Sequence, residues 1–144
     1  MLVQQILKSK ATGGVHTIKP GSSVADAASV LSNMKIGSVV VSATGKTADG
    51  ILSERDIVRE LGKRGAVCMS DRVEDMMTKK LVVCGPADRA DDILQKMTNG
   101  RFRHMPVVEG GEMVGLITLG DVVKARLTEL SMEKEALEGM IMGH

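Results

Sequence analysis

Apolar residues along this chain follow two spacings, one typical of helices with a buried face and one typical of buried strands. From Ser23 to Met34 they recur every three or four positions, which predicts a helix that Ser22 or Ser23 can cap. Short aliphatic runs follow at residues 39–41 and 50–52, as expected of buried strands. The pattern therefore predicts a helix followed by a pair of strands.

The second half of the chain has the same order of elements. A helix is predicted from Asp88 to Asn99, with Asp88 as its cap, and strand-like segments follow from residue 102 and from residue 115. A further helix is expected after Ser53 and another after Thr118, because each is followed by apolar residues at helical spacing. A short strand is also expected before each of two prolines, Pro20 and Pro86.

The remaining segments connect or extend these elements. Residues 62–70 are interpreted as a linker and residues 71–77 as a short helix. Gly37 and Gly100 stand near the predicted helix ends, where glycine commonly terminates a helix. The tail from Ser131 to Gly143 is expected either to extend the last helix or to lie on a neighbouring molecule.

The two halves correspond residue by residue. The spacing that separates Pro20 from Pro86 also separates Asp26 from Asp92 and Asn33 from Asn99. A correspondence that continues through helices and strands indicates an internal duplication. Each copy is predicted to run strand, helix, strand, strand, helix.

This duplication predicts the fold class and the domain boundaries. A single copy cannot cover both faces of its small sheet, whereas two copies packed face to face can. We therefore expect a pseudo-two-fold α/β fold with a cleft between the copies. Residues 1–69 are assigned to the first copy with its N-terminal segment and linker, residues 70–130 to the second copy, and residues 131–144 to a helical tail.

An ordered set of short motifs resembles the cystathionine-β-synthase-type (CBS) domain family. The motifs are Ile51–Asp56, Asp75–Thr78, Phe102–Val108 and Gly115–Asp121, and the resemblance covers about residues 2–128. The resemblance implies a stand-alone pair of CBS repeats, commonly dimerised. It also implies adenosine-containing ligands, such as AMP, ADP, ATP or NAD(H), bound between the repeats.

A hydroxyl-x-x-aspartate element occurs once in each copy, as Ser53 with Asp56 and as Thr118 with Asp121. The resemblance assigns the two aspartates to the ribose hydroxyls of the ligand, with the Ser or Thr hydroxyl adding a further bond. The same spacing at a helix start is also typical of a capping box, which involves no ligand. Both roles stay open, because a side chain that caps in the empty protein can turn to the ligand.

Cationic residues for a phosphate differ between the copies. By resemblance, Arg103 and His104 face the same cleft as Asp121, and a guanidinium makes paired bonds to phosphate oxygens. Arg55 takes a comparable part beside Asp56, unless these arginines are solvated surface charges. Gly37 and Ser38 stand opposite Arg103 and His104, so the two sites are expected to be inequivalent.

Aliphatic residues and backbone are expected to hold the adenine, because the chain has no Trp or Tyr and a single Phe. The resemblance assigns one group of residues to the Asp121 cleft and another to the Asp56 cleft. The first is Thr12, Gly14, Val15, Ile36 and Gly37, and the second is Met77, Thr78 and Val82. Ordinary packing is the alternative role for the apolar ones.

Composition excludes several other functions. The net charge is +1, from 19 basic and 18 acidic side chains that are interleaved, so a nucleic-acid partner is not expected. No phosphate-binding glycine loop, catalytic set or metal-ligand spacing occurs, which favours a protein that is not an enzyme and holds no metal. Without a run long enough for a signal peptide or a membrane span, we expect a cytoplasmic location.

The sequence therefore predicts an adenine-nucleotide sensor that forms a homodimer and acts on a separate protein. The alternative is a structural or dimerisation module with unoccupied clefts.

Overall fold

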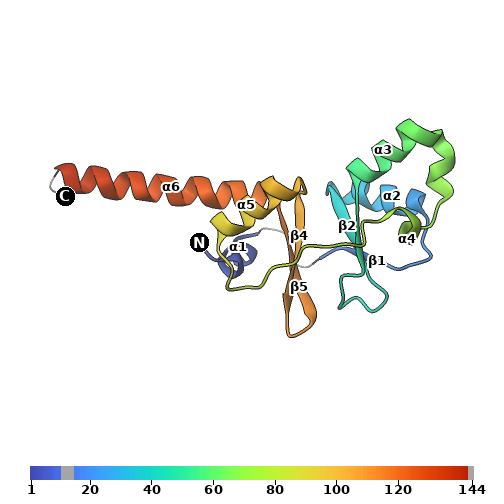
Figure 1. Cartoon of the computed structure of the whole chain (residues 1–144), viewed down its shortest axis with the longest axis horizontal. Helices are drawn as coiled ribbons and strands as arrows, with labels where there is room; N and C mark the ends of the chain where they lie inside the picture. The colour runs from blue at the N-terminus through green and yellow to red at the C-terminus, as the bar shows by residue number, and fades with distance from the viewer. Residues whose placement is uncertain (11–14, 143–144) are drawn as a thin grey trace. The chain divides into compact units, whose positions relative to one another are not determined.

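The computed structural model of the chain describes residues 1–10 and 15–142 and divides them into two compact units. The α3 unit contains the described residues of 14–82 and 108–114. The α6 unit contains the described residues of 1–13, 83–107 and 115–144. Both combine helices with strands, as the predicted fold class requires (Figure 1).

The α3 unit has the predicted order of strand, helix, strand, strand, helix. Its elements are β1 (Thr17–Ile18), α2 (Val24–Met34), β2 (Ser38–Val41), β3 (Gly50–Ser53) and α3 (Glu54–Arg64). β2 is central, parallel to β1 and antiparallel to β3. The buried face of α2, with Val24, Ala27 and Leu31, packs with Val39 and Leu52 in the core of this unit. Ser23 caps α2 by accepting a hydrogen bond from the Asp26 amide at 3.0 Å, which confirms one of the two expected caps.

The segment after α3 is more regular than a linker. α3 continues to Arg64, a 3₁₀ helix (η1) covers Gly65–Ser70, and α4 covers Val73–Met76. Main-chain bonds from Val24 N to Asp71 O and from Val73 N to Ser22 O, both 2.8 Å, hold this segment against the start of α2.

The α6 unit contains α1 (Val3–Ser9), α5 (Ala90–Gly100) and α6 (Leu119–Met142), together with the parts of β4 (His104–Glu109) and β5 (Glu112–Thr118) that lie outside residues 108–114. β4 and β5 form a hairpin. Aliphatic side chains from α1, α5, both strands and the first turns of α6 make one core. Its fully buried members include Val3, Ile93, Met105, Val107, Ile117 and Val122. The tail extends the last helix, since α6 runs for 24 residues.

The second copy lacks the strand that was expected before Pro86. Only a single parallel bridge joins Cys84 to Val107, because the next residues turn: the Gly85 amide donates to Asp88 Oδ2 at 2.8 Å. Asp88 is therefore engaged in this turn, and the prediction that it caps α5 is wrong. α5 begins after Arg89, and the Ala90 amide donates instead to the carbonyl of Met1 at 2.9 Å.

The first long helix of each copy, α2 and α5, ends on a charged residue and not on a glycine. Lys35 closes α2 and Arg101 closes α5, each in the left-handed conformation with φ of 55°. Gly100 is the last residue of α5, and Gly37 follows beyond the end of α2. Nearness of a glycine therefore did not identify the capping residue in either helix.

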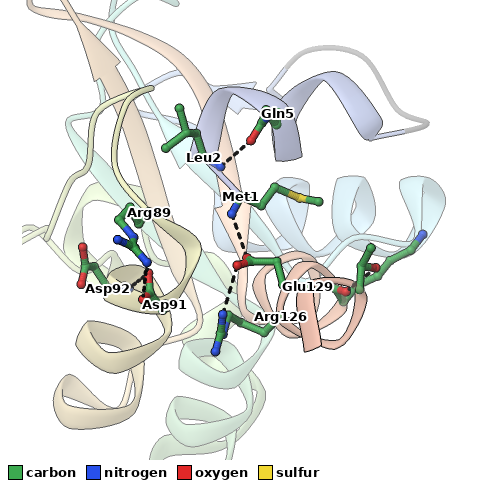
Figure 2. Close-up of polar contacts among 10 residues, drawn as sticks. Met1, Leu2, Gln5, Arg89, Asp91, Asp92, Arg126 and Glu129 are labelled. Carbon is green, nitrogen blue, oxygen red and sulfur yellow. Dashed lines mark hydrogen bonds and ion pairs between the residues drawn. The ribbon is translucent and has the colours of Figure 1, made fainter. Parts of the chain in front are cut away.

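The N-terminal segment packs with the second copy, although the sequence grouped it with the first. The amino group of Met1 pairs with Glu129 Oε1 at 3.0 Å, and Arg126 holds Glu129 Oε2 at 3.1 Å (Figure 2). The Val3 amide donates to Asp88 O at 2.8 Å and a bridge joins Leu2 to Arg89. The compact units therefore do not follow the sequence repeats at this end.

Candidate functional site

Both hydroxyl-x-x-aspartate elements lie where a strand passes directly into a helix. In the α3 unit, the Asp56 amide donates to Ser53 Oγ at 3.2 Å, and the Ser53 amide donates back to Asp56 Oδ2 at 3.0 Å. In the α6 unit, the Asp121 amide donates to Thr118 Oγ1 at 3.2 Å and the Thr118 amide donates to Asp121 Oδ2 at 2.9 Å. Each pair therefore forms a reciprocal capping box.

The oxygens of the two aspartates are occupied to different degrees. Asp56 uses both: Oδ2 also accepts from the Ser53 hydroxyl at 3.0 Å, and Oδ1 holds Arg59 at 2.7 Å. Its side chain is 9% exposed. The Asp121 side chain is 22% exposed, and its contacts with the described residues all go to Oδ2, which leaves Oδ1 without a hydrogen bond from them.

Lys10 forms an ion pair with the Asp121 carboxylate, and the sequence did not indicate this contact. Its ammonium is 2.9 Å from Asp121 Oδ2 and donates to the carbonyl of Leu116 at 2.9 Å. Burial of Asp121 raises its pKa, but the hydrogen bond and charge of Lys10 and the bonds from Thr118 outweigh burial, so the pKa lies below its ordinary value. Asp121 is therefore held as a carboxylate. No local signal could have found Lys10, because it is remote from Asp121 in sequence.

The predicted cations lie near the starts of these helices. The carbonyl of Arg103 accepts from the Leu119 amide at 2.8 Å, which places the Arg103 backbone at the first turn of α6. The Arg103 side chain is exposed, whereas His104 is half-buried. In the first copy, the carbonyl of Gly37 accepts from the Glu54 amide at 2.9 Å. The predicted equivalence of Gly37 and Arg103 is thus repeated in the hydrogen bonding of the two units.

Arg55 lines a surface hollow on α3. The hollow measures about 450 Å³ and is lined by Glu54, Arg55, Val58 and Arg59. Arg55 is exposed there and contributes with Arg59 two positive charges beside the start of the helix. Because Arg59 is already paired with Asp56, Arg55 is the cation that remains available on this surface.

Residues predicted to line the ligand fall into two groups. Thr12 and Gly14 lie outside the described residues. Val15, Ile36 and Gly37 are half-buried and belong to the α3 unit, whereas Asp121 belongs to the α6 unit. Their predicted role toward Asp121 therefore stays a prediction.

Met77, Thr78 and Val82 share the α3 unit with Asp56. Thr78 exchanges two main-chain bonds with Ile51, of 3.0 and 2.8 Å, and so extends the edge of β3. Met77 packs on Gly50, where an added Cβ would lie 2.7 Å from Met77 Cγ. Val82 is 43% exposed. Met77 and Thr78 thus have structural contacts of their own, and their role toward a ligand stays a prediction.

Neither a cluster that could hold a metal ion nor an activated Cys84 thiol occurs among the described residues. No group of three or more His, Cys, Asp or Glu side chains within residues 1–10 and 15–142 could hold a metal ion. Burial raises the pKa of the Cys84 thiol to about 11, with a further contribution from Asp88, so this thiol is not a nucleophile near neutral pH. None of the helices in this part of the chain is both long enough and apolar enough to cross a membrane.

Comparisons with known proteins agree on one family. The family model described as CBS domain matches twice, at residues 5–63 and 73–128. The chain is similar to the mitochondrial CBS domain-containing protein CBSX3 of Arabidopsis thaliana, with 32% identity over 98% of this chain and 72% of that protein. A crystal structure of a CBS-domain protein from Agrobacterium tumefaciens is 40% identical with a TM-score of 0.83, over 88% of this chain and 99% of that one.

A more distant structure was solved with ligands. The CBS domain pair of the protein MJ0100, in complex with 5′-methylthioadenosine and S-adenosyl-L-methionine, superposes with a TM-score of 0.77 at 22% identity. The overlap covers 90% of this chain and 98% of that one. At this identity the likeness concerns the fold.

Proposed function

Because this chain belongs to the CBS-domain family, we propose that it is a regulatory module that binds an adenine nucleotide and signals its occupancy to a separate protein. The observation that carries the proposal is the carboxylate at the start of α6. Asp121 is ionised, partly exposed and has Oδ1 available among the described contacts. A carboxylate with a free oxygen can accept hydrogen bonds from the vicinal hydroxyls of a ribose.

The Asp121 site is the stronger of the two. Asp56 would have to give up Arg59 or the Ser53 bonds before it could accept from a sugar, whereas Asp121 can accept through Oδ1 and keep its cap. The Asp121 site also has cations nearby, with Lys10 on the carboxylate and the exposed Arg103 at the same helix start. Two cations suit a ligand that carries phosphate.

The ligand class follows from the family and from the chemistry of the site. AMP, ADP, ATP and NAD(H) share adenosine with the two compounds bound to the CBS pair of MJ0100, which supports an adenosine-containing ligand here. Aliphatic residues would contact the base, because Phe102 is the only aromatic residue and packs against the core of its unit.

Catalysis, location and oligomeric state complete the proposal. The module is proposed to work without catalysis, because its candidate groups bind and do not react. It is proposed to act in the cytoplasm on a protein still to be identified. It is proposed to be a homodimer, which is supported by exposed apolar residues on α3 and α6, among them Val58, Leu61, Val123 and Leu127.

A structural module with unoccupied sites is the second candidate. It is supported by the two capping boxes, because Asp56 and Asp121 both stabilise a helix start without any ligand. In that case the two aspartates would be retained for stability alone.

A thermal-shift panel separates the candidates. AMP, ADP, ATP, NAD, NADH and S-adenosylmethionine would be tested at millimolar concentrations, with GTP as the control for the base. A ligand at a hundred times its dissociation constant adds about 2.7 kcal/mol to the free energy of unfolding, so we expect a clear rise in Tm with at least one adenine compound. No shift with any of them would favour the structural module, and product formation from ATP would contradict the absence of catalysis.

A further inference from the structure

The distal part of α6 projects from its unit without a described partner. Figure 1 shows the helix continuing past α1 and α5 of the same unit. Every residue from 131 to 142 is exposed except the half-buried Gly139. Beyond Glu129, the only polar side-chain contact within the described part of the chain is between Lys134 and Glu138 of the same helix, at 3.8 Å.

Such a segment is a poor helix by itself. An isolated helix of about a dozen residues is marginal in water, and Gly139 lowers the helix propensity further. Five large apolar side chains are nevertheless exposed on it: Met132 at 62%, Leu137 at 59%, Met140 at 78%, Ile141 at 84% and Met142 at 69%. A stable helix here needs a surface that covers some of them.

The exposed residues of α6 form a heptad seam. We use this name for Val123, Leu127, Leu130, Lys134, Leu137 and Ile141, whose spacing alternates between four and three residues. At about 100° per residue, the six positions fall within an arc of about 80° on one side of the helix. All five apolar members are exposed, from 40% for Val123 to 84% for Ile141. Alternating spacings of three and four define the seam of a two-stranded coiled coil.

We propose that this seam pairs with the same seam of a second copy of the chain, as an antiparallel coiled coil. The inference deepens the homodimer of the proposed function by assigning its surface and polarity. A second copy is the occupant that supplies an identical seam of equal length. One polar residue, Lys134, interrupts the seam, as expected of a coiled coil whose register is specified by a single polar core position.

Charge complementarity decides the polarity. In a parallel pair, Lys134 would face Lys134 of the second copy, and Glu133 would face Glu138 of the second copy on both flanks. These are like-charge contacts. In the antiparallel alignment that uses all six positions, Lys134 faces Leu130 of the second copy, and Lys124 faces Glu138 of the second copy on both flanks. Only the two copies of Glu133 then approach each other, and Lys134 lies beside them.

The first experiment measures assembly. The double variant Leu137→Glu with Ile141→Glu places charges in the seam, and the double variant Met132→Glu with Ala136→Glu places them on the opposite face as a control. All four side chains are exposed, so both variants should keep the circular-dichroism spectrum of the folded units. In sedimentation equilibrium we expect the seam variant to dissociate roughly a hundredfold more readily than the natural chain, and the control to remain a dimer.

The second experiment measures polarity by oxidative cross-linking. Leu127 faces Leu137 of the second copy in the antiparallel pair, so Leu127→Cys and Leu137→Cys should form a disulfide when the two variants are mixed, reduced and reoxidised. Each variant alone should stay uncross-linked. The natural Cys68 and Cys84 are buried, and the unchanged chain measures their background.

The outcomes distinguish this inference from the proposed function. A dimer that survives in the seam variant overturns the seam and leaves the homodimer intact. A natural chain that is monomeric overturns both. Cross-linking of each cysteine variant alone would overturn the antiparallel polarity. Nucleotide binding is measured separately, and its result does not depend on whether the seam forms a dimer.

Discussion

At the scale of single residues, two aspartates with the same sequence context differ in what they can still bind. Asp56 is almost fully buried, and both of its carboxylate oxygens accept hydrogen bonds, from Ser53 and from Arg59. Asp121 contacts Thr118 and Lys10 through one oxygen, Oδ2. The difference arises from neighbours outside the motif, one from the same helix and one from the N-terminal segment.

The contact between Lys10 and Asp121 predicts a pH dependence of stability. The pKa of Asp121 in the folded protein lies below the value of about 4 for an unfolded aspartate, so the stabilisation is complete above pH 4 and is lost as the pH falls through the folded pKa. Lys10→Met should cost about 1 kcal/mol at pH 7 and progressively less as the pH falls through the folded pKa of Asp121. Urea denaturation at several pH values measures this difference.

Lys8→Met is the matched control for Lys10→Met. Lys8 is exposed at the end of α1 and has no ion pair with the described residues. Its replacement should leave the dependence of the free energy of unfolding on acid pH unchanged. A Lys10 variant whose loss of stability stays constant from pH 7 down to the acid unfolding of the protein would contradict the ionic origin of the contact.

Residue-scale features were predictable only where the sequence places the partners close together. Ser53 with Asp56 and Thr118 with Asp121 could be identified because capping acts over three residues. Lys10 could not, because the fold alone brings it to Asp121.

At the scale of elements, the N-terminal helix α1 docks on the second copy through a close contact with β5. A Cβ at Gly115 would lie 2.7 Å from Leu7 Cδ2 and 2.9 Å from Leu7 Cδ1. Val3 and Ile6 of the same helix are buried in the core of the α6 unit. The strand therefore needs a residue without a side chain where the helix crosses it.

Gly115→Ala should destabilise the protein by about 1 kcal/mol, because the added methyl group forces the half-buried Leu7 side chain out of its position against the strand. Gly62→Ala is the control: Gly62 lies in α3 with open space around it, so alanine should stabilise the helix by about 0.5–1 kcal/mol. Differential scanning calorimetry should show a lower Tm for the Gly115 variant and a higher Tm for the Gly62 variant. A Gly115 variant as stable as the natural chain would contradict close docking of α1.

The elements with strong periodicity were predicted well, and their ends less well. α2 and α5 follow from apolar residues at helical spacing, with Val24, Ala27, Ile93 and Met97 buried as expected. The start of α5 was misplaced because the carbonyl of Met1 accepts the Ala90 amide, and no local pattern reports a distant carbonyl. The strand before Pro86 was reduced to one bridge because Asp88 closes a turn there.

At the scale of the whole molecule, the duplication predicted the order of elements and the motif resemblance predicted the family, but neither predicted which segments make up each unit. The repeats in the sequence run continuously, whereas the α6 unit joins the first ten residues to the second copy. The N-terminal segment belongs to the α6 unit because the core of that unit buries Val3 and Ile6. The repeat pattern does not indicate which core buries these two residues. The ligand is likewise a property of the assembled protein, since the proposed site takes Lys10 from one end of the chain and Asp121 from the other.

Isothermal titration calorimetry can measure whether Asp121 binds the vicinal hydroxyls of an adenosine ligand. The natural chain, Asp121→Ala and Asp56→Ala would each be titrated with AMP and with its 2′,3′-dideoxy analogue. We predict that AMP binds the natural chain, that the dideoxy analogue binds at least tenfold more weakly, and that Asp121→Ala weakens AMP binding more than Asp56→Ala does. Equal affinity for the two nucleotides, or equal losses in the two variants, would contradict this role of Asp121.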